Sequence, residues 1–156
     1  MASSSFVRPT HGGLNMHELH ELGLAPEQVL DFSANINPLG PPPAVRDALA
    51  RLDVSAYPDP ECRALRAALS QRLEVPASRI LMGNGSTELI YLLARAYLKP
   101  NQHAAILTPT FGEYEAACVA ARADFIELPA LPQSGFQWDI SYIATALADV
   151  RPGVVF

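Results

Sequence analysis

The residues best suited to chemistry lie in one stretch, Gly83-Asn84-Gly85-Ser86-Thr87, between an apolar run and a helical pattern. The first turn of a helix presents unpaired backbone N–H groups and the positive end of the helix dipole, so it can bind a phosphate. Glycines let the backbone approach an anion, and Ser86 and Thr87 add hydroxyl donors. An ordinary strand-to-helix turn is the alternative. The stretch lacks the Gly-Lys-Ser/Thr of a P-loop and the GxGxxG of a dinucleotide site.

A second candidate is the loop Thr108-Pro109-Thr110-Phe111-Gly112-Glu113-Tyr114, which follows another apolar run. Ligands of open α/β sheets bind outside the carboxyl ends of the strands. If the two runs are neighbouring strands, Phe111 can stack on a flat ring whose phosphate rests at Ser86 and Thr87. The alternative is that Phe111 is a core aromatic residue.

The elements that position these loops alternate between strand and helix. Expected strands cover 80–82, 104–107, 125–128 and 154–156, and expected helices cover 86–98, 113–122 and 140–148. The helix at 86–98 should bury one face, formed by Leu89, Leu92, Leu93, Ala96 and Tyr97. This alternation predicts an α/β fold with right-handed crossovers and a mainly parallel sheet.

The first half of the chain reads differently. A short helix is expected within 14–24, and 31–43 should be extended because its four prolines exclude a helix. Apolar residues at helical spacing predict two more helices, within 45–52 and 62–73.

Composition limits the classes of function. The chain has 156 residues, 49% of them hydrophobic, which suggests one domain with a real core. A net charge of −5 and a charged fraction of 17% give no case for nucleic acid or a membrane. Two distant cysteines fit reduced thiols in a cytoplasmic protein, and no segment reaches transmembrane length.

Four motifs in order carry a resemblance: residues 35–40, Tyr57-Pro58-Asp59, residues 83–88 and residues 109–114. Together they resemble fold-type-I pyridoxal-phosphate (PLP) enzymes of the histidinol-phosphate aminotransferase-like family. His11-Gly12-Gly13 and residues 31–38 are most similar to its threonine-phosphate decarboxylase branch, which serves cobalamin biosynthesis. The resemblance implies a three-layer α/β/α large domain. Residues 1–40 would then be an N-terminal arm and small-domain segment, and 41–156 an incomplete first part of the large domain.

The resemblance also implies roles for single residues. The turn of Gly85, Ser86 and Thr87 would hold the phosphate of PLP, and Phe111 would stack on its ring. Tyr57 would reach the cofactor phosphate of the partner subunit, which implies a homodimer.

His11, Asn37 and Tyr114 would line the pocket for a phosphorylated amino acid, L-threonine O-3-phosphate. Without the resemblance, Tyr57 reads as a turn aromatic and His11 as a tail residue. The alternatives are a histidinol-phosphate-type aminotransferase and a non-catalytic fragment or paralogue.

The chain departs from that family in its lysines. Schiff-base chemistry needs a lysine amine, and the one lysine here, Lys99, follows a helix as a solvated charge before a proline. We therefore expect no catalytic residue in this chain and no activity from these 156 residues. No metal site is expected either, because His17 and His20 lack a third ligand. The strand that ends at Phe156 suggests a missing remainder.

Overall fold

The computed structural model describes residue 9 and residues 11–156. Residues 1–8 and 10, which begin the expected N-terminal arm, lie outside the described residues. The chain forms two compact units. The helical unit is His11–Arg72, and the sheet unit is built mainly from Leu73–Phe156.

The helical unit contains three α-helices and one 3-10 turn, and it carries little core of its own. In chain order these elements are α1 (Met16–Leu22), η1 (Pro26–Gln28), α2 (Pro43–Ala50) and α3 (Arg63–Leu73). The Asn15 side chain caps α1 by accepting from the backbone of His17 and Glu18, and Gly23 ends the helix in the left-handed conformation. Residues 31–42 contain no helix, as their prolines predict. Neither α2 nor α3 has a buried residue.

The first glycines of the helical unit pack against the segment around Ser33. The Gly13 N–H donates to Ser33 Oγ at 2.8 Å, and Ser33 in turn hydrogen-bonds to Asp31. A Cβ added to Gly12 would stand 1.9 Å from the Ser33 carbonyl oxygen. Gly12 is therefore required by this close approach. The contact joins the two segments, 11–13 and 31–38, that resemble the decarboxylase branch.

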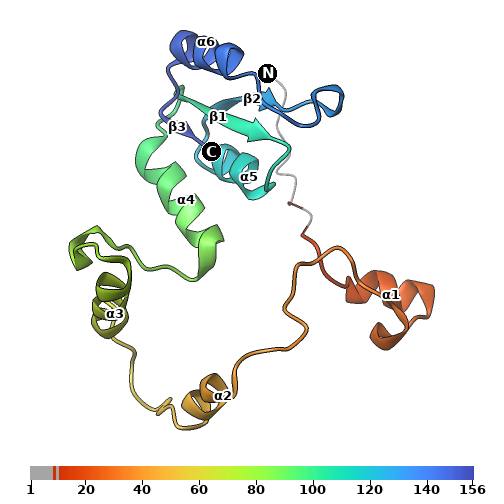
Figure 1. The fold of residues 1–156 in the computed structure, drawn as a ribbon, viewed down its shortest axis with the longest axis vertical. Helices are drawn as coiled ribbons and strands as arrows, with labels where there is room; N and C mark the ends of the chain where they lie inside the picture. Colours follow the sequence, from red (N-terminus) through yellow and green to blue (C-terminus); the bar gives the residue numbers. More distant parts are fainter. Residues whose placement is uncertain (1–8, 10) are drawn as a thin grey trace. The chain divides into compact units, whose positions relative to one another are not determined.

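The sheet unit is a mixed α/β structure with three parallel strands (Figure 1). Its elements in chain order are η2 (Ala77–Arg79), α4 (Gly85–Tyr97), β1 (His103–Thr108), α5 (Glu113–Ala120), β2 (Asp124–Pro129), η3 (Pro132–Ser134), α6 (Ile140–Val150) and β3 (Val154–Val155). The strand order β2-β1-β3 places β1 in the centre, with Ala104 opposite Phe125 on one side and Val154 on the other.

The order of the strands fixes where the helices lie. The chain crosses from β1 to β2 in one direction and returns past β1 to reach β3. Right-handed crossovers in opposite directions put α5 and α6 on opposite faces of the sheet. The sheet unit therefore has the parallel sheet that the alternation predicted and the α/β/α layering that the resemblance implied.

Helix α4 packs through a narrow stripe of side chains, mainly against α5. Ile90, Ala94 and Leu98 join Ala104 and Ile106 of β1 in the core cluster. The predicted face of this helix was wrong, because residues 92, 93 and 97 are exposed. The helix packs mainly against α5, and the small Ala94 and Ala117 in the same cluster allow the two helices a close approach.

The strand predicted at 80–82 was also wrong. These residues follow η2 without regular structure, and Ile80 is extended, with φ −109° and ψ 117°. The local sequence thus gives strand-like torsions, but no strand among the described residues pairs with them, and a strand needs a ladder partner. In the part of the chain that the structure describes, no helix is both long and apolar enough to span a membrane.

Candidate functional site

The strand order of the sheet unit creates a switch point at one edge of the sheet. Strand β2 lies on one side of β1 and β3 on the other, so the chain changes direction between β1 and β3, and such switch points form crevices at the carboxyl ends of strands. The loop 109–112 leaves β1 at this edge. Phe156 continues β3 there, since its N–H donates to Ala105 at 2.8 Å and its carbonyl accepts from Leu107 at 2.9 Å.

Helix α4 brings its N-terminus toward the same edge. It ends at Tyr97, shortly before β1 begins at His103, and it packs mainly against α5, which likewise ends shortly before the neighbouring strand β2 begins. The two helices therefore lie side by side, and both run opposite to the strands. Thirteen helical residues and six strand residues both span about 20 Å. The first turn of α4 therefore belongs to the carboxyl-end side of the sheet.

The N-terminus of α4 is built to leave its first amides open. Asn84 is the N-cap residue, but its side chain does not cap the helix. Instead the Glu88 carboxylate accepts from the Asn84 backbone N–H and, at 3.1 Å, from Asn84 Nδ2. The next three N–H groups, at Gly85, Ser86 and Thr87, have no acceptor within the helix by geometry.

The two glycines of the turn serve different purposes. Gly85 has φ +84°, a conformation that side chains rarely adopt, and the space where its Cβ would stand is open. At Gly83 a Cβ would instead lie 2.8 Å from Leu89 Cδ2, so the Leu89 side chain would have to shift. The turn thus combines an open approach at Gly85 with close side-chain packing at Gly83.

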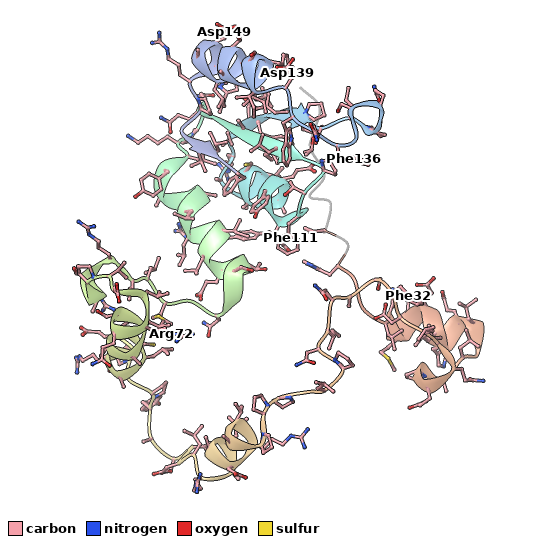
Figure 2. The ribbon with its side chains drawn as sticks, in the orientation of Figure 1. Phe32, Arg72, Phe111, Phe136, Asp139 and Asp149 are labelled. Carbon is pink, nitrogen blue, oxygen red and sulfur yellow. The ribbon has the colours of Figure 1, made fainter. Side chains whose placement is uncertain are left out.

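An aromatic group stands at the ends of β1 and β3. Phe111, in the loop between β1 and α5 (Figure 2), is 39% exposed, which argues against the core-aromatic alternative. The Tyr114 ring meets Phe111 edge to face, with centroids 6.1 Å apart. On Phe156 the Tyr114 ring stacks at 4.9 Å and 13°. Phe111 therefore offers accessible ring surface while Tyr114 supports it.

Sequence reasoning missed one acidic residue beside this loop. Glu113, the first residue of α5, is 5% exposed, and its carboxylate lies near the hydroxyl of Tyr91 of α4. Burial and this carboxylate raise the pKa of the Tyr91 hydroxyl. A glutamate in the first turn of a helix normally reads as a solvated charge, so no local signal revealed its burial. Glu88 could have been found, since it lies one helical turn from Asn84.

The remaining predicted site residues belong to the helical unit, and their roles in the site stay predictions. His11 is exposed. The Asn37 side chain closes a local turn, accepting from the Leu39 N–H at 3.0 Å and donating to the Gly40 carbonyl at 3.4 Å. Tyr57 is fully exposed.

Other chemistry is sparse in the described part of the chain. No group of three or more His, Cys, Asp or Glu side chains there could hold a metal ion. His17 instead faces Glu21 at 3.6 Å on the surface of α1. Lys99 is exposed just beyond α4, where its N–H donates to the Gln102 side chain at 2.9 Å.

The donors at the edge of the sheet fit a phosphate that is joined to a flat ring. Backbone N–H groups and the hydroxyls of Ser86 and Thr87 suit a phosphate, and open space in front of Gly85 admits it. Phe111 presents a partly exposed aromatic ring for stacking.

Comparison with known proteins places the chain in one family. Residues 27–156 match the family described as aminotransferase class I and II, and the chain belongs to this family. The family uses pyridoxal 5′-phosphate. Two curated relatives and one solved structure show which branches of this family the chain resembles.

The threonine-phosphate decarboxylase of Salmonella typhimurium is 50% identical over 106 residues, which cover 67% of this chain and 29% of that protein. The chloroplastic histidinol-phosphate aminotransferase of Nicotiana tabacum is 38% identical over 136 residues, covering 86% of this chain and 32% of that protein. Among solved structures, the histidinol-phosphate aminotransferase of Sinorhizobium meliloti in complex with pyridoxal-5′-phosphate matches with a TM-score of 0.69 at 21% identity, over 78% of this chain and 33% of that one. The chain thus spans about a third of the length of these relatives.

Proposed function

We propose that this chain forms the cofactor-anchoring portion of a PLP-dependent enzyme that decarboxylates L-threonine O-3-phosphate, in cobalamin biosynthesis. The observation that carries the proposal is the open first turn of α4 on the same edge of the sheet as the accessible Phe111 ring. The substrate assignment is supported by the 50% identity to a threonine-phosphate decarboxylase.

In this proposal the sheet unit binds the cofactor. The N–H groups of Gly85, Ser86 and Thr87, with the two hydroxyls, hold the phosphate dianion against the positive end of the α4 dipole. Phe111 stacks on the pyridine ring and excludes water from one of its faces. When bound, the cofactor supplies an electron sink for a bond that breaks at the substrate α-carbon.

The other predicted residues complete the proposal. His11, Asn37 and Tyr114 line the pocket of the phosphorylated substrate. Tyr57 reaches the cofactor phosphate of a second copy, so the enzyme is a homodimer. The full exposure of Tyr57 is compatible with a contact to a second copy. A cytoplasmic location remains the expectation from the reduced thiols.

We do not assign the Schiff-base role to Lys99. Its position after the C-terminus of α4, together with its exposure, leaves its amine in water rather than in the enclosed pocket that activates a Schiff-base lysine. Borohydride reduction of this chain with PLP, followed by mass spectrometry of its peptides, should therefore give no adduct on Lys99. An adduct there would overturn this view.

One alternative enzyme has specific support. The tobacco histidinol-phosphate aminotransferase aligns with more of this chain, 86% against 67%, although at lower identity. A transaminase would use the same cofactor anchor and break the α C–H bond instead. The third reading, a non-catalytic fragment or paralogue, predicts neither reaction.

Two hybrid proteins separate these readings. In the first, this chain is joined to the part of the Salmonella decarboxylase that follows the matched segment; in the second, it is joined to the corresponding part of the tobacco aminotransferase. The proposal predicts CO₂ release from L-threonine O-3-phosphate by the first hybrid and little activity in the second. Amino transfer from histidinol phosphate to 2-oxoglutarate by the second hybrid alone would favour the alternative. Two folded hybrids that bind no PLP would favour the non-catalytic reading.

A further inference from the structure

The start of α4 differs from the starts of α1 and α6. Asn15 caps α1, because its side-chain oxygen accepts from the backbone N–H groups of His17 at 3.1 Å and Glu18 at 3.3 Å. Asp139 caps α6 in the same way, through two N–H groups of the first turn. Asn84 holds the same position at α4 and has the same side chain as Asn15, yet it makes no capping hydrogen bond. Asparagine at this position normally accepts from the first turn, so a further contact must hold Asn84 away.

The residue that makes this contact is Glu88, four positions later. One oxygen of its carboxylate, Oε2, accepts from the backbone N–H of Asn84 and, at 3.1 Å, from the side-chain Nδ2 of the same residue. The corresponding residues of α1 and α6 are Leu19 and Ile143, and neither has a side chain that can accept a hydrogen bond. A Cβ on Gly83 would lie 3.1 Å from Glu88 Oε2, so a glycine there leaves room for the carboxylate. Among these three helices, the acceptor occurs only in the one whose cap is missing.

The two hydrogen bonds of Glu88 determine what the first turn of α4 can bind. A capping Asn84 would accept from the N–H of Ser86 or Thr87, which are the groups that the proposed phosphate needs. The backbone of Asn84 has ψ 68°, against 104° and 101° for the two residues that do cap their helices. We propose that Glu88 is a positioning residue, which holds Asn84 in a non-capping conformation and so keeps these N–H groups free for an anion. This inference rests on the proposed function, because it assigns the open turn to the cofactor phosphate.

A purely structural role for Glu88 explains the arrangement less well. A glutamate that stabilises a helix start normally forms a capping box, in which the N-cap side chain also accepts from the first turn. Here the carboxylate satisfies the Asn84 N–H, while the Asn84 side chain leaves the first turn uncapped. A structural role predicts that the turn loosens when the acceptor is lost. The positioning role predicts the opposite, because the freed Asn84 side chain then caps the helix.

The test compares two neutral replacements in the 156-residue chain, Glu88→Gln and Glu88→Met. Glutamine keeps an acceptor oxygen at the end of its side chain, whereas methionine has a similar length and only a weakly accepting sulfur. Because both replacements remove the same charge, the difference between them reports the acceptor alone. The same two replacements in an Asn84→Ala background are the matched control, since an alanine side chain cannot cap.

Two measurements are made on the parent chain and on these variants. The first is hydrogen exchange of the Ser86 and Thr87 N–H groups, followed by nuclear magnetic resonance without a ligand, and the second is titration with inorganic phosphate. Relative to Glu88→Gln, Glu88→Met should slow the exchange of at least one of these N–H groups, because the freed Asn84 accepts from it. Glu88→Met should also bind phosphate about two- to tenfold more weakly, since the anion must displace one cap. In the Asn84→Ala background the two replacements should behave alike.

Three results would overturn the inference. They are unchanged or faster exchange in Glu88→Met, equal phosphate affinity of the two replacements, and a difference between them that persists in the Asn84→Ala background. A parent chain that binds neither phosphate nor PLP would instead overturn the proposed function, while the exchange comparison would still test whether Glu88 holds Asn84 out of the cap.

Discussion

Replacing Gly85 by alanine isolates the backbone geometry on which the phosphate turn depends. The residue has φ +84°, and the position of an added Cβ is open, with no atom within 4 Å. The substitution therefore creates no clash, and its whole effect comes from the conformation. A non-glycine residue in this region costs about 1–2 kcal/mol, which the chain meets either as lost stability or by turning the Gly85 peptide away from its present direction.

Gly135 offers a matched control. It too has positive φ, +64°, and open space for a Cβ, but it lies in the loop between η3 and α6. Gly135→Ala should therefore carry a similar conformational cost without touching the first turn of α4. The difference between the two variants measures the contribution of the turn itself.

The assays are chemical unfolding and ligand titration of both variants. Both should lose about 1–2 kcal/mol in the free energy of unfolding, or show less if the turn relaxes. Gly85→Ala should also weaken PLP and inorganic phosphate about tenfold, since a re-aimed N–H loses one charge-assisted hydrogen bond worth about 1.5–3 kcal/mol. Equal ligand affinity in the Gly85→Ala variant and the parent chain would refute the reasoning. So would an equal loss of affinity in Gly135→Ala.

Three further predictions concern single side chains. Glu88→Gln keeps an acceptor for the Asn84 N–H but removes a negative charge from the first turns of α4. The affinity for inorganic phosphate should therefore rise, by less than about tenfold. A fall in phosphate affinity would contradict this. Burial raises the pKa of the Cys118 thiol to about 11, so iodoacetamide at pH 8 should modify the partly exposed Cys62 first and Cys118 only after unfolding. The Asp59 carboxylate accepts hydrogen bonds from the backbone N–H groups of Arg63 and Glu61, and these bonds hold its pKa below 3.8. Asp59 therefore stabilises α3 above that pH, and this stabilisation should be lost as acid protonates the carboxylate of the folded chain. Helical circular dichroism of the parent chain and of Asp59→Ala as a function of pH would show the loss.

The features that the sequence could predict are those set by local patterns. Alternating apolar runs and helical spacings placed β1, α5, β2, α6 and β3 within a few residues of their observed bounds, and the glycine-rich turn marked the start of α4. The prolines between residues 31 and 43 kept that segment free of helix up to the start of α2. These elements depend on residues that are near one another in the chain, so composition and spacing were sufficient.

The features that it could not predict depend on distant partners. The strand at 80–82 failed because strand pairing requires a neighbour, which no local pattern supplies. The buried stripe of α4 shares a cluster with residues of β1 and α5, which come together only once these elements are placed. The stacking of Phe156 on Tyr114 required the order β2-β1-β3, and no local pattern signalled the burial of Glu113. In each case packing between elements decided what the local sequence left open.

The central claim is that the first turn of α4 holds the cofactor phosphate while Phe111 covers its ring. A crystal structure of the Salmonella hybrid grown with PLP tests it most directly. We expect phosphate oxygens within hydrogen-bond distance of the Ser86 and Thr87 N–H groups and the pyridine ring stacked on Phe111. A fully loaded protein with its phosphate bound elsewhere, or with Phe111 turned away from the ring, would contradict it.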